Sequence, residues 1–160
     1  MGQSLYFARR YDRAVEQLRT TVALAPNFWW AHDLLGWAYE GKGKLPEAIA
    51  EFQKARQLET TIAEPLASLG RAYALTGKVD EARKVLTELN EVSKRNHVPP
   101  YYFATIFAAL GDKDQAIASL EKAYQERSWY IDWLAVDPQL DNLRDDPRFQ
   151  DLRRRAGLPQ

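Results

Sequence analysis

The stretch of sequence that decides the fold is WWAHDLLGWAYEGKGKLPEAIAEFQKARQLETTI, residues 29–62. Within it, Ala48 is followed four residues later by Phe52, and the same combination of a small and a bulky apolar residue returns 34 residues away in both directions. The recurring pairs are Ala14 with Leu18, Ala48 with Phe52, Ala82 with Leu86 and Ala116 with Leu120. A period of this length indicates a solenoid, in which each unit is one helix pair that buries its apolar face against neighbouring units.

Further positions share the period in the half of each unit that precedes the alanine. They are Leu35, Leu69 and Phe103, then Gly36, Gly70 and Ala104, then Tyr39, Tyr73 and Phe107. These columns resemble the tetratricopeptide repeat, whose unit is a helix, a turn and a second helix. In this register a truncated repeat spans residues 1–28, and fuller ones span 29–62, 63–96 and 97–130. The resemblance implies an array over residues 1–128, an all-α, right-handed α-solenoid of about three and a half helix hairpins.

Local signals divide the units into helices. Turns are marked by glycines such as Gly77 and Gly111, between runs of helical periodicity. Gly36 and Gly70 fall inside helices, where glycine costs about 1 kcal/mol relative to alanine, so we expect a second helix to approach closely there. The sequence predicts helices over residues 10–24, 27–41, 45–58, 62–76, 79–95, 99–110, 112–126 and 147–156.

Residues 129–160 are expected to form C-terminal capping helices. Asp137 and Asp146 each precede a proline, which is the pattern of an N-cap followed by the first helical residue. Trp129, Tyr130 and Trp133 are expected to cover the open end of the last repeat as part of the core. The stretch from Val136 to Leu158 is also similar to the C-terminal end of repeat arrays in bacterial signalling proteins, including winged-helix transcriptional regulators, adenylate cyclases and serine/threonine kinases.

Composition narrows the classes of function. The 22 acidic residues balance the 22 basic ones, which argues against a general polyanion binder, and the absence of cysteine excludes disulfides and cysteine metal sites. We expect no nucleic-acid contact, and we interpret Arg153–Arg155 as cations at the end of a helix. Neither a signal peptide nor a membrane-length apolar run is evident, so a cytoplasmic location is expected. Because the first repeat is truncated, Met1 is expected to begin a fragment of a longer protein.

No motif in the chain predicts catalysis, a metal or a cofactor. Gly41-Lys42-Gly43-Lys44 lacks the spacing of a phosphate-binding loop and is expected to be a turn between helices. His32 and His97 stand in different repeats without the spacing of metal ligands. Carboxylates gather in the tail, at Asp132, Asp137, Asp141, Asp145 and Asp146. The sequence gives them neither a mutual geometry nor a reason for raised pKa values, so we expect no enzyme activity.

The candidate binding site follows from the resemblance, which implies that the first helix of each repeat lines a concave groove. The groove residues expected to contact a partner are Trp30, Asp33, Trp37, Glu40, Glu64, Arg71, Tyr101 and Thr105. Trp30 and Trp37 lie on one helical face beside two carboxylates, and aromatic residues with polar neighbours are typical of interface hot spots. The alternative is that Trp37 packs between neighbouring first helices and Trp30 against the truncated one.

These observations predict a non-catalytic module that binds a protein or peptide in its groove, within a bacterial regulatory protein. One alternative is a sensory domain that binds a small molecule in the groove. Another is self-association, for example as a homodimer, through the N-terminal end. There the half-helix from Gly2 to Ala8 is expected to leave Val15, Leu18 and Val22 uncovered.

Overall fold

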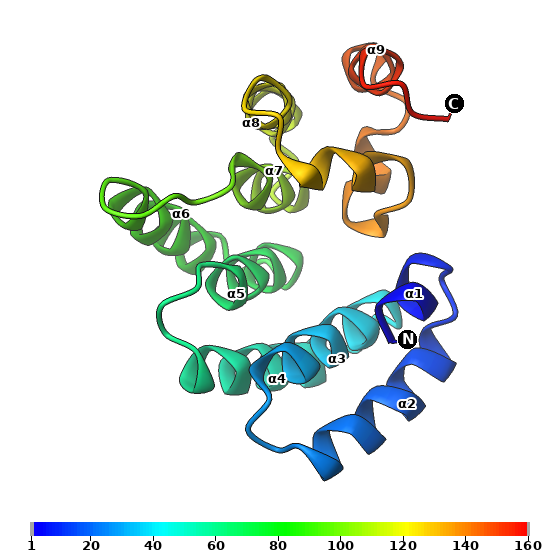
Figure 1. Cartoon of the computed structure of the whole chain (residues 1–160). Helices are drawn as coiled ribbons and strands as arrows, with labels where there is room; N and C mark the ends of the chain where they lie inside the picture. Colours follow the sequence, from blue (N-terminus) through cyan, green and yellow to red (C-terminus); the bar gives the residue numbers. More distant parts are fainter. Residues whose placement is uncertain (1, 160) are drawn as a thin grey trace.

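Helices account for all regular structure between residues 2 and 159, the part of the chain that the computed structural model describes (Figure 1). The α-helices are α1 (Gly2–Phe7), α2 (Tyr11–Leu24), α3 (Trp29–Gly41), α4 (Leu45–Leu58), α5 (Glu64–Leu75), α6 (Val79–Ser93), α7 (Pro100–Ala109), α8 (Lys113–Gln125) and α9 (Pro147–Arg155). Two 3₁₀ helices, η1 (Trp129–Ala135) and η2 (Pro138–Leu143), lie between α8 and α9. The predicted all-α, right-handed solenoid is confirmed, and every predicted helix lies within two residues of an observed one.

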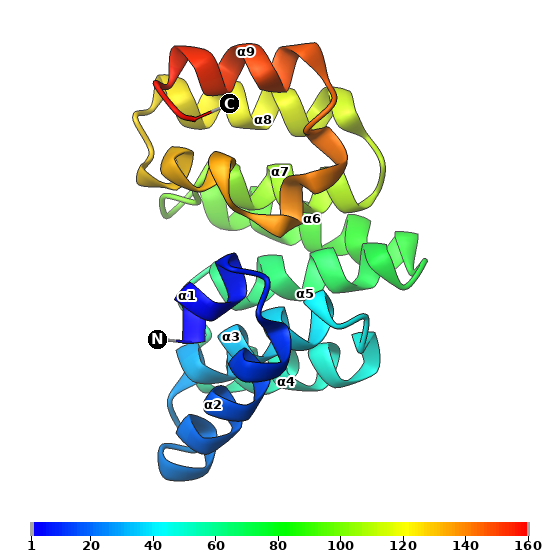
Figure 2. The same cartoon turned by 90° about the vertical axis from the view of Figure 1, so that its right-hand side faces the viewer.

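Consecutive helices pair as hairpins, and the hairpins stack in two layers (Figures 1 and 2). The inner layer consists of α1, α3, α5 and α7, which contact one another in that order, and each packs against the helix that follows it. We call the exposed side of this layer the inner face. The four recurring alanines lie where the second helix of each hairpin meets its neighbours, and all four are fully buried.

The mid-helix glycines permit close helix contacts. A Cβ atom on Gly70 would lie 2.6 Å from Cγ1 of Val85 on α6, and one on Gly36 would overlap the ring of Phe52 on α4. Real Cβ contacts are not this short, so a side chain at either position would force the hairpin apart. The predicted reason for glycine at these positions is therefore correct.

The N-terminal end is better covered than the sequence suggested. A Cβ atom on Gly2 would lie 2.6 Å from Cδ2 of Leu18, so α1 packs on α2 in the same manner as the later hairpins. Val15 and Leu18 are buried, and Val22 is partly buried. The expectation that the half-helix leaves these residues uncovered was wrong for Val15 and Leu18, because α1 packs directly on Leu18. Val22 remains partly exposed.

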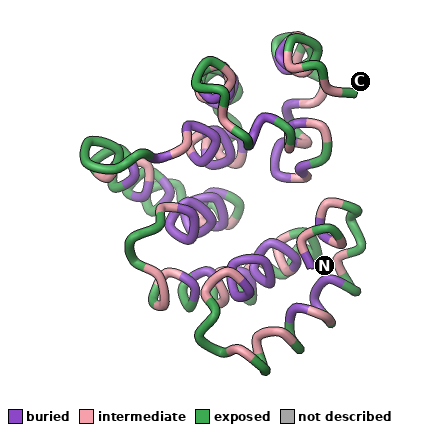
Figure 3. Tube along the Cα trace, in the orientation of Figure 1, coloured by how far each residue is buried: buried purple, intermediate pink, exposed green. Residues whose placement is uncertain are grey.

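The tail segment, which we define as residues 129–143, was not predicted in its observed form. It folds into η1 and η2 and turns back over the inner face, toward α1, before the chain continues into α9 (Figure 2). Burial extends from the inner helices into this segment (Figure 3), with Leu134, Leu140 and Leu143 fully buried. Phe149 and Leu152 of α9, which packs beside α8, are also fully buried.

Two sequence-based expectations for the tail have different outcomes. The caps at Asp137 and Asp146 are confirmed, because their carboxylates accept hydrogen bonds from the backbone N–H groups of Gln139 and Arg148, each at 2.9 Å. The placement of Trp129, Tyr130 and Trp133 was wrong in part. Trp129 is 60% exposed, and the other two turn toward the inner face, since η1 does not continue the line of α8. No helix among residues 2–159 has the length and apolar character needed to cross a bilayer.

Candidate functional site

All five tryptophans of the chain form one continuous row across the inner face. The ring centroids of Trp29 and Trp30 are 5.3 Å apart, and those of Trp30 and Trp37 are 5.5 Å apart. Trp37 lies 6.1 Å from Trp133, which lies 4.9 Å from Trp129. We call this row the tryptophan strip. It joins α3 to η1, two elements almost a hundred residues apart in the sequence.

Exposure varies along the tryptophan strip. Trp37, at its centre, is only 4% exposed, and its indole N–H donates to the Ser68 hydroxyl of α5 at 3.1 Å. This burial agrees with the alternative in which Trp37 packs between neighbouring first helices. Trp30 is partly exposed, and Trp129 is the most exposed of the five. The two ends of the strip are therefore accessible to solvent, whereas its centre is not.

The tail segment is held on the inner face by aromatic contacts around Trp133. Its ring centroid lies 5.1 Å from that of Phe7 in α1 and 6.0 Å from that of Tyr101 in α7. Tyr130 stacks on Tyr101 at 5.1 Å with an angle of 17° between the rings. One indole thus bridges the first helix of the chain, the third and the seventh, and it fixes the tail segment against three repeats at once.

Polar contacts reinforce this arrangement. The Tyr101 hydroxyl donates to the buried Asp137 carboxylate of the tail segment. Arg71 Nη1 donates to the backbone oxygen of Gln139 at 3.1 Å, while its Nε donates to Glu40 at 2.8 Å. Two predicted groove residues, Arg71 and Tyr101, therefore bind a segment of the same chain.

The two ends of the chain also meet at an ion pair. Arg9, just after α1, donates two hydrogen bonds to the Asp141 carboxylate of η2, at 2.6 and 2.7 Å. Arg144 donates to the same carboxylate at 2.7 Å. Because Arg9 and Asp141 are 47% and 40% exposed, water screens the pair and it contributes at most about 1 kcal/mol.

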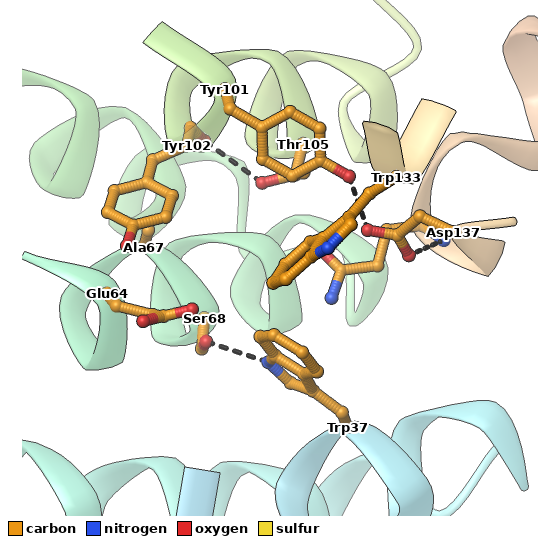
Figure 4. Close-up of a pocket in the computed structure, with 10 residues that line it drawn as sticks. Trp37, Glu64, Ala67, Ser68, Tyr101, Tyr102, Thr105, Trp133 and Asp137 are labelled. Carbon is orange, nitrogen blue, oxygen red and sulfur yellow. Dashed lines mark hydrogen bonds between the residues drawn. The ribbon is translucent and has the colours of Figure 1, made fainter. Parts of the chain in front are cut away.

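A small pocket lies beneath the centre of the tryptophan strip (Figure 4). It is lined by Trp37, Glu64, Ala67, Ser68, Tyr101, Tyr102, Thr105, Trp133, Asp137 and Gln139. The space open to the centre of a water molecule is about 10 Å³, which is roughly the room for one water. The pocket thus combines aromatic walls with carboxylates and hydroxyl groups.

Three buried carboxyl groups in and beside the pocket have raised pKa values. Burial raises the pKa of Glu64 to about 7 and that of Asp137 to about 6. Burial, followed by the nearby charge of Glu64, raises the pKa of Asp33 well above its usual range. Among the tail carboxylates, for which the sequence offered no reason for a raised pKa, Asp137 is an exception because it is fully buried.

The structure brings most of the predicted groove residues together. Trp37, Glu64, Tyr101 and Thr105 line the pocket, and Asp33 reaches it through Ser68, whose hydroxyl donates to Asp33 Oδ2 at 3.1 Å. The remaining three lie at the rim or beside it: Trp30 in the tryptophan strip, and Glu40 and Arg71 as a buried ion pair. Sequence reasoning missed Ser68, Tyr102, Trp133, Asp137 and Gln139. The last three lie in the tail, where no repeat period indicates which way a side chain faces.

Other sequence candidates have local structural roles. The ring nitrogens of His32 bond to Glu51 at 2.7 Å and to the backbone oxygen of Pro26 at 2.9 Å, on the side of α3 that faces α4. Lys42 ends α3 as its C-cap, within the predicted turn. Arg155 pairs with Glu121 and Asp151. Among residues 2–159, His, Cys, Asp and Glu side chains form no group of three suited to a metal ion.

Comparison with known proteins gives two family matches and several relatives. Models described as tetratricopeptide repeat match residues 1–60 and residues 103–128, together just over half of the chain. The beta-barrel assembly-enhancing protease of Escherichia coli (strain K12) is 31% identical over 117 residues, which is 73% of this chain and 24% of that protein. Superkiller protein 3 of Schizosaccharomyces pombe is 26% identical over 101 residues, 63% of this chain and 7% of that protein. The chain thus spans about a quarter or less of the length of these relatives.

Proposed function

Because the chain belongs to the tetratricopeptide repeat family, we propose that it is a non-catalytic protein-interaction module whose partner segment binds along the tryptophan strip. The observation that carries this proposal is the strip itself, which gathers every tryptophan of the chain on one face and leaves its two ends partly exposed. Tryptophan is enriched among the residues that dominate binding energy at protein interfaces. A soluble domain without a partner has little reason to keep such rings at its surface.

The partner binds over the tail segment and does not replace it. Leu134, Leu140 and Leu143 are fully buried, and removing them from the inner face would expose the apolar surface of three large side chains. Each such side chain contributes about 1.5–3 kcal/mol when buried. Displacing all three would therefore cost roughly as much as a micromolar partner gains on binding, about 8 kcal/mol. Trp30 and Trp129 are therefore the partner contacts, and Trp37 supports them from below.

The contacts of the tail segment show which chemical groups bind to the inner face. It supplies an aromatic ring at Trp133, a carboxylate at Asp137 and a backbone oxygen at Gln139, which meet Tyr101 and Arg71. A partner segment that carries an aromatic or long aliphatic side chain matches the remaining surface, because the exposed part of the strip is apolar.

The proposal includes a bacterial regulatory protein as the parent and a cytoplasmic location. This part rests on the similarity of the stretch from Val136 to Leu158 to the ends of repeat arrays in bacterial signalling proteins. The full gene tests it: a winged-helix, cyclase or kinase module encoded in the same chain supports a regulatory parent, whereas a protease module encoded there contradicts it.

The binding test compares matched variants of the immobilised chain. Trp30→Ala with Trp129→Ala removes one accessible ring on each side of the buried Trp37, and Leu24→Ala removes a side chain that is 83% exposed but lies outside the strip. Two aromatic hot spots contribute about 2 kcal/mol each or more, so the double variant should bind roughly a thousandfold more weakly if the losses add. A partner that is captured equally by wild type, Leu24→Ala and a folded double variant contradicts the proposal.

A further inference from the structure

Two buried carboxylates at the pocket have oxygen atoms without a hydrogen-bond partner. Glu64 is 7% exposed and its Oε1 has none, although the side chain points into the pocket (Figure 4). Asp33 is fully buried, and its Oδ1 has none either. Buried polar atoms are nearly always hydrogen-bonded, and an unpaired carboxylate is among the costliest groups to bury. The Tyr102 hydroxyl interacts with the Glu64 carboxyl, but Glu64 Oε1 and Asp33 Oδ1 each keep the capacity to accept a further hydrogen bond.

The donors that line the pocket are already engaged within the protein. The Trp37 indole donates to Ser68, and Ser68 donates to Asp33. The Tyr101 hydroxyl is bonded to Asp137. The Thr105 hydroxyl donates to the backbone oxygen of Tyr102 at 3.0 Å, and the Tyr102 and Tyr130 hydroxyl groups bond to each other at 2.5 Å. The pocket is thus left with free hydrogen-bond acceptors, so a ligand that donates hydrogen bonds fits it best.

The charge around the pocket also favours a cation. Four carboxyl groups lie buried on this side of the inner layer, on Asp33, Glu40, Glu64 and Asp137. Arg71 is the buried guanidinium that faces them, and it is paired with Glu40 at 2.8 Å. Asp33 and Glu64 have no cationic partner among residues 2–159. A positive charge in the pocket would lie beside the Glu64 carboxyl, with the Asp33 carboxyl behind Ser68.

The walls of the pocket select the kind of cation. Trp37, Trp133, Tyr101 and Tyr102 contribute aromatic rings, whose faces attract a cation through their quadrupoles. Aromatic rings are not ligands for hard metal ions, which prefer a shell of oxygen atoms. The room is about 10 Å³ for a water-sized centre, so an –NH₃⁺ group fits, whereas a trimethylammonium group is too large.

We propose that the pocket beneath the tryptophan strip binds a primary alkylammonium group, with Glu64 as its main anionic partner. The ammonium group would donate to Glu64 Oε1, and its alkyl chain would leave between Trp37 and Trp133. Asp33 lies behind Ser68 and would add negative charge without contacting the ligand. Such a group is carried by a lysine side chain or by a small free amine. The lysine source rests on the proposed function, since the side chain would belong to the partner segment on the strip. The binding of a free amine does not depend on that function.

The first test uses n-butylammonium chloride as the probe of the full chain. Its binding is followed by the NMR shifts of the Trp37 and Trp133 indole N–H groups, with tetramethylammonium chloride at equal concentration as the control for charge and ionic strength. Glu64→Gln keeps the size of the side chain and removes its charge, and Glu47→Gln changes an exposed glutamate on α4. We expect saturable shifts for wild type and Glu47→Gln, an affinity at least tenfold lower for Glu64→Gln, and no saturation with tetramethylammonium.

The second test identifies the source of the ammonium group. If a captured partner binds at least tenfold more weakly after its lysines are acetylated, and if Glu64→Gln abolishes this difference, the ligand is the partner's lysine. If acetylation has no effect while butylammonium still binds wild type selectively, the ligand is a free amine and the site stands. The proposal is overturned if butylammonium does not bind, or binds Glu64→Gln as tightly as wild type. That result leaves the role of Trp30 and Trp129 in partner binding untouched.

Discussion

Replacing Trp133 with alanine should detach the tail segment from the inner face. The ring of Trp133 lies 4.9–6.1 Å from five other aromatic rings, those of Phe7, Trp37, Tyr101, Trp129 and Tyr130. Removing a fully buried aromatic ring costs about 3–5 kcal/mol. Since Trp133 is partly exposed, we expect Trp133→Ala to lower the free energy of unfolding by ~2–3 kcal/mol.

The chain offers a matched control four residues earlier. Trp129 is 60% exposed, and its ring contacts those of Tyr130 and Trp133. Trp129→Ala should therefore lower the free energy of unfolding by less than ~1 kcal/mol. The two variants remove the same type of side chain from η1, so the difference between them reports the burial and ring contacts that Trp133 has and Trp129 lacks.

Urea unfolding followed by far-ultraviolet circular dichroism measures both variants. With a slope of about 2 kcal/mol per molar urea, Trp133→Ala should shift the midpoint down by roughly 1 M. Limited proteolysis should also cut Trp133→Ala first between residues 126 and 146, because a detached tail segment exposes its backbone. Equal midpoints for the two variants would refute the claim that Trp133 anchors the tail segment.

Three further predictions follow from other contacts. Gly70→Ala should lower the free energy of unfolding by ~1–3 kcal/mol, because the added methyl group overlaps Val85. Urea titration measures this loss. A variant as stable as wild type would show that α5 and α6 move apart without cost. Because the pKa values of Glu64 and Asp137 are raised, the folded state binds more protons than the unfolded state between about pH 4.5 and 7. The thermal midpoint of unfolding should therefore fall as the pH rises through this window. A midpoint that rises instead would contradict the burial of these two carboxyl groups. Because α1 covers Leu18, light scattering should show a monomer at micromolar concentration, and a dimer that Leu18 variants weaken would restore self-association through this end.

The repeats were predictable from sequence because their physics is local and recurs. A small residue at Ala48 and Ala82, a glycine at Gly36 and Gly70, and a fixed period determine how each helix meets the next. Each unit repeats the same contacts, so the clearer repeats indicate the helix positions in a repeat whose own pattern is weak. The helix boundaries followed from the same signals.

The tail segment was not predictable in this way because its contacts are long-range and occur once. Nothing near Trp133 in the sequence indicates that its ring meets Phe7, and nothing near Asp141 points to Arg9. The raised pKa of Asp137 depends on the burial of this residue of the tail segment. The part of the candidate site on the first helices of the repeats could therefore be predicted from the recurring positions of the repeat. The part in the tail segment required the tertiary structure.

The position of the tail segment on the inner face is tested most directly by the NMR nuclear Overhauser spectrum of the full chain in solution. We expect cross-peaks from the indole protons of Trp133 to the ring protons of Phe7 and Tyr101, whose ring centroids lie 5.1 and 6.0 Å away. These cross-peaks would place the tail segment on the inner face, with the pocket beneath the tryptophan strip. Cross-peaks from Trp133 to Trp129 and Tyr130 alone, with indole shifts typical of an unfolded chain, would contradict it.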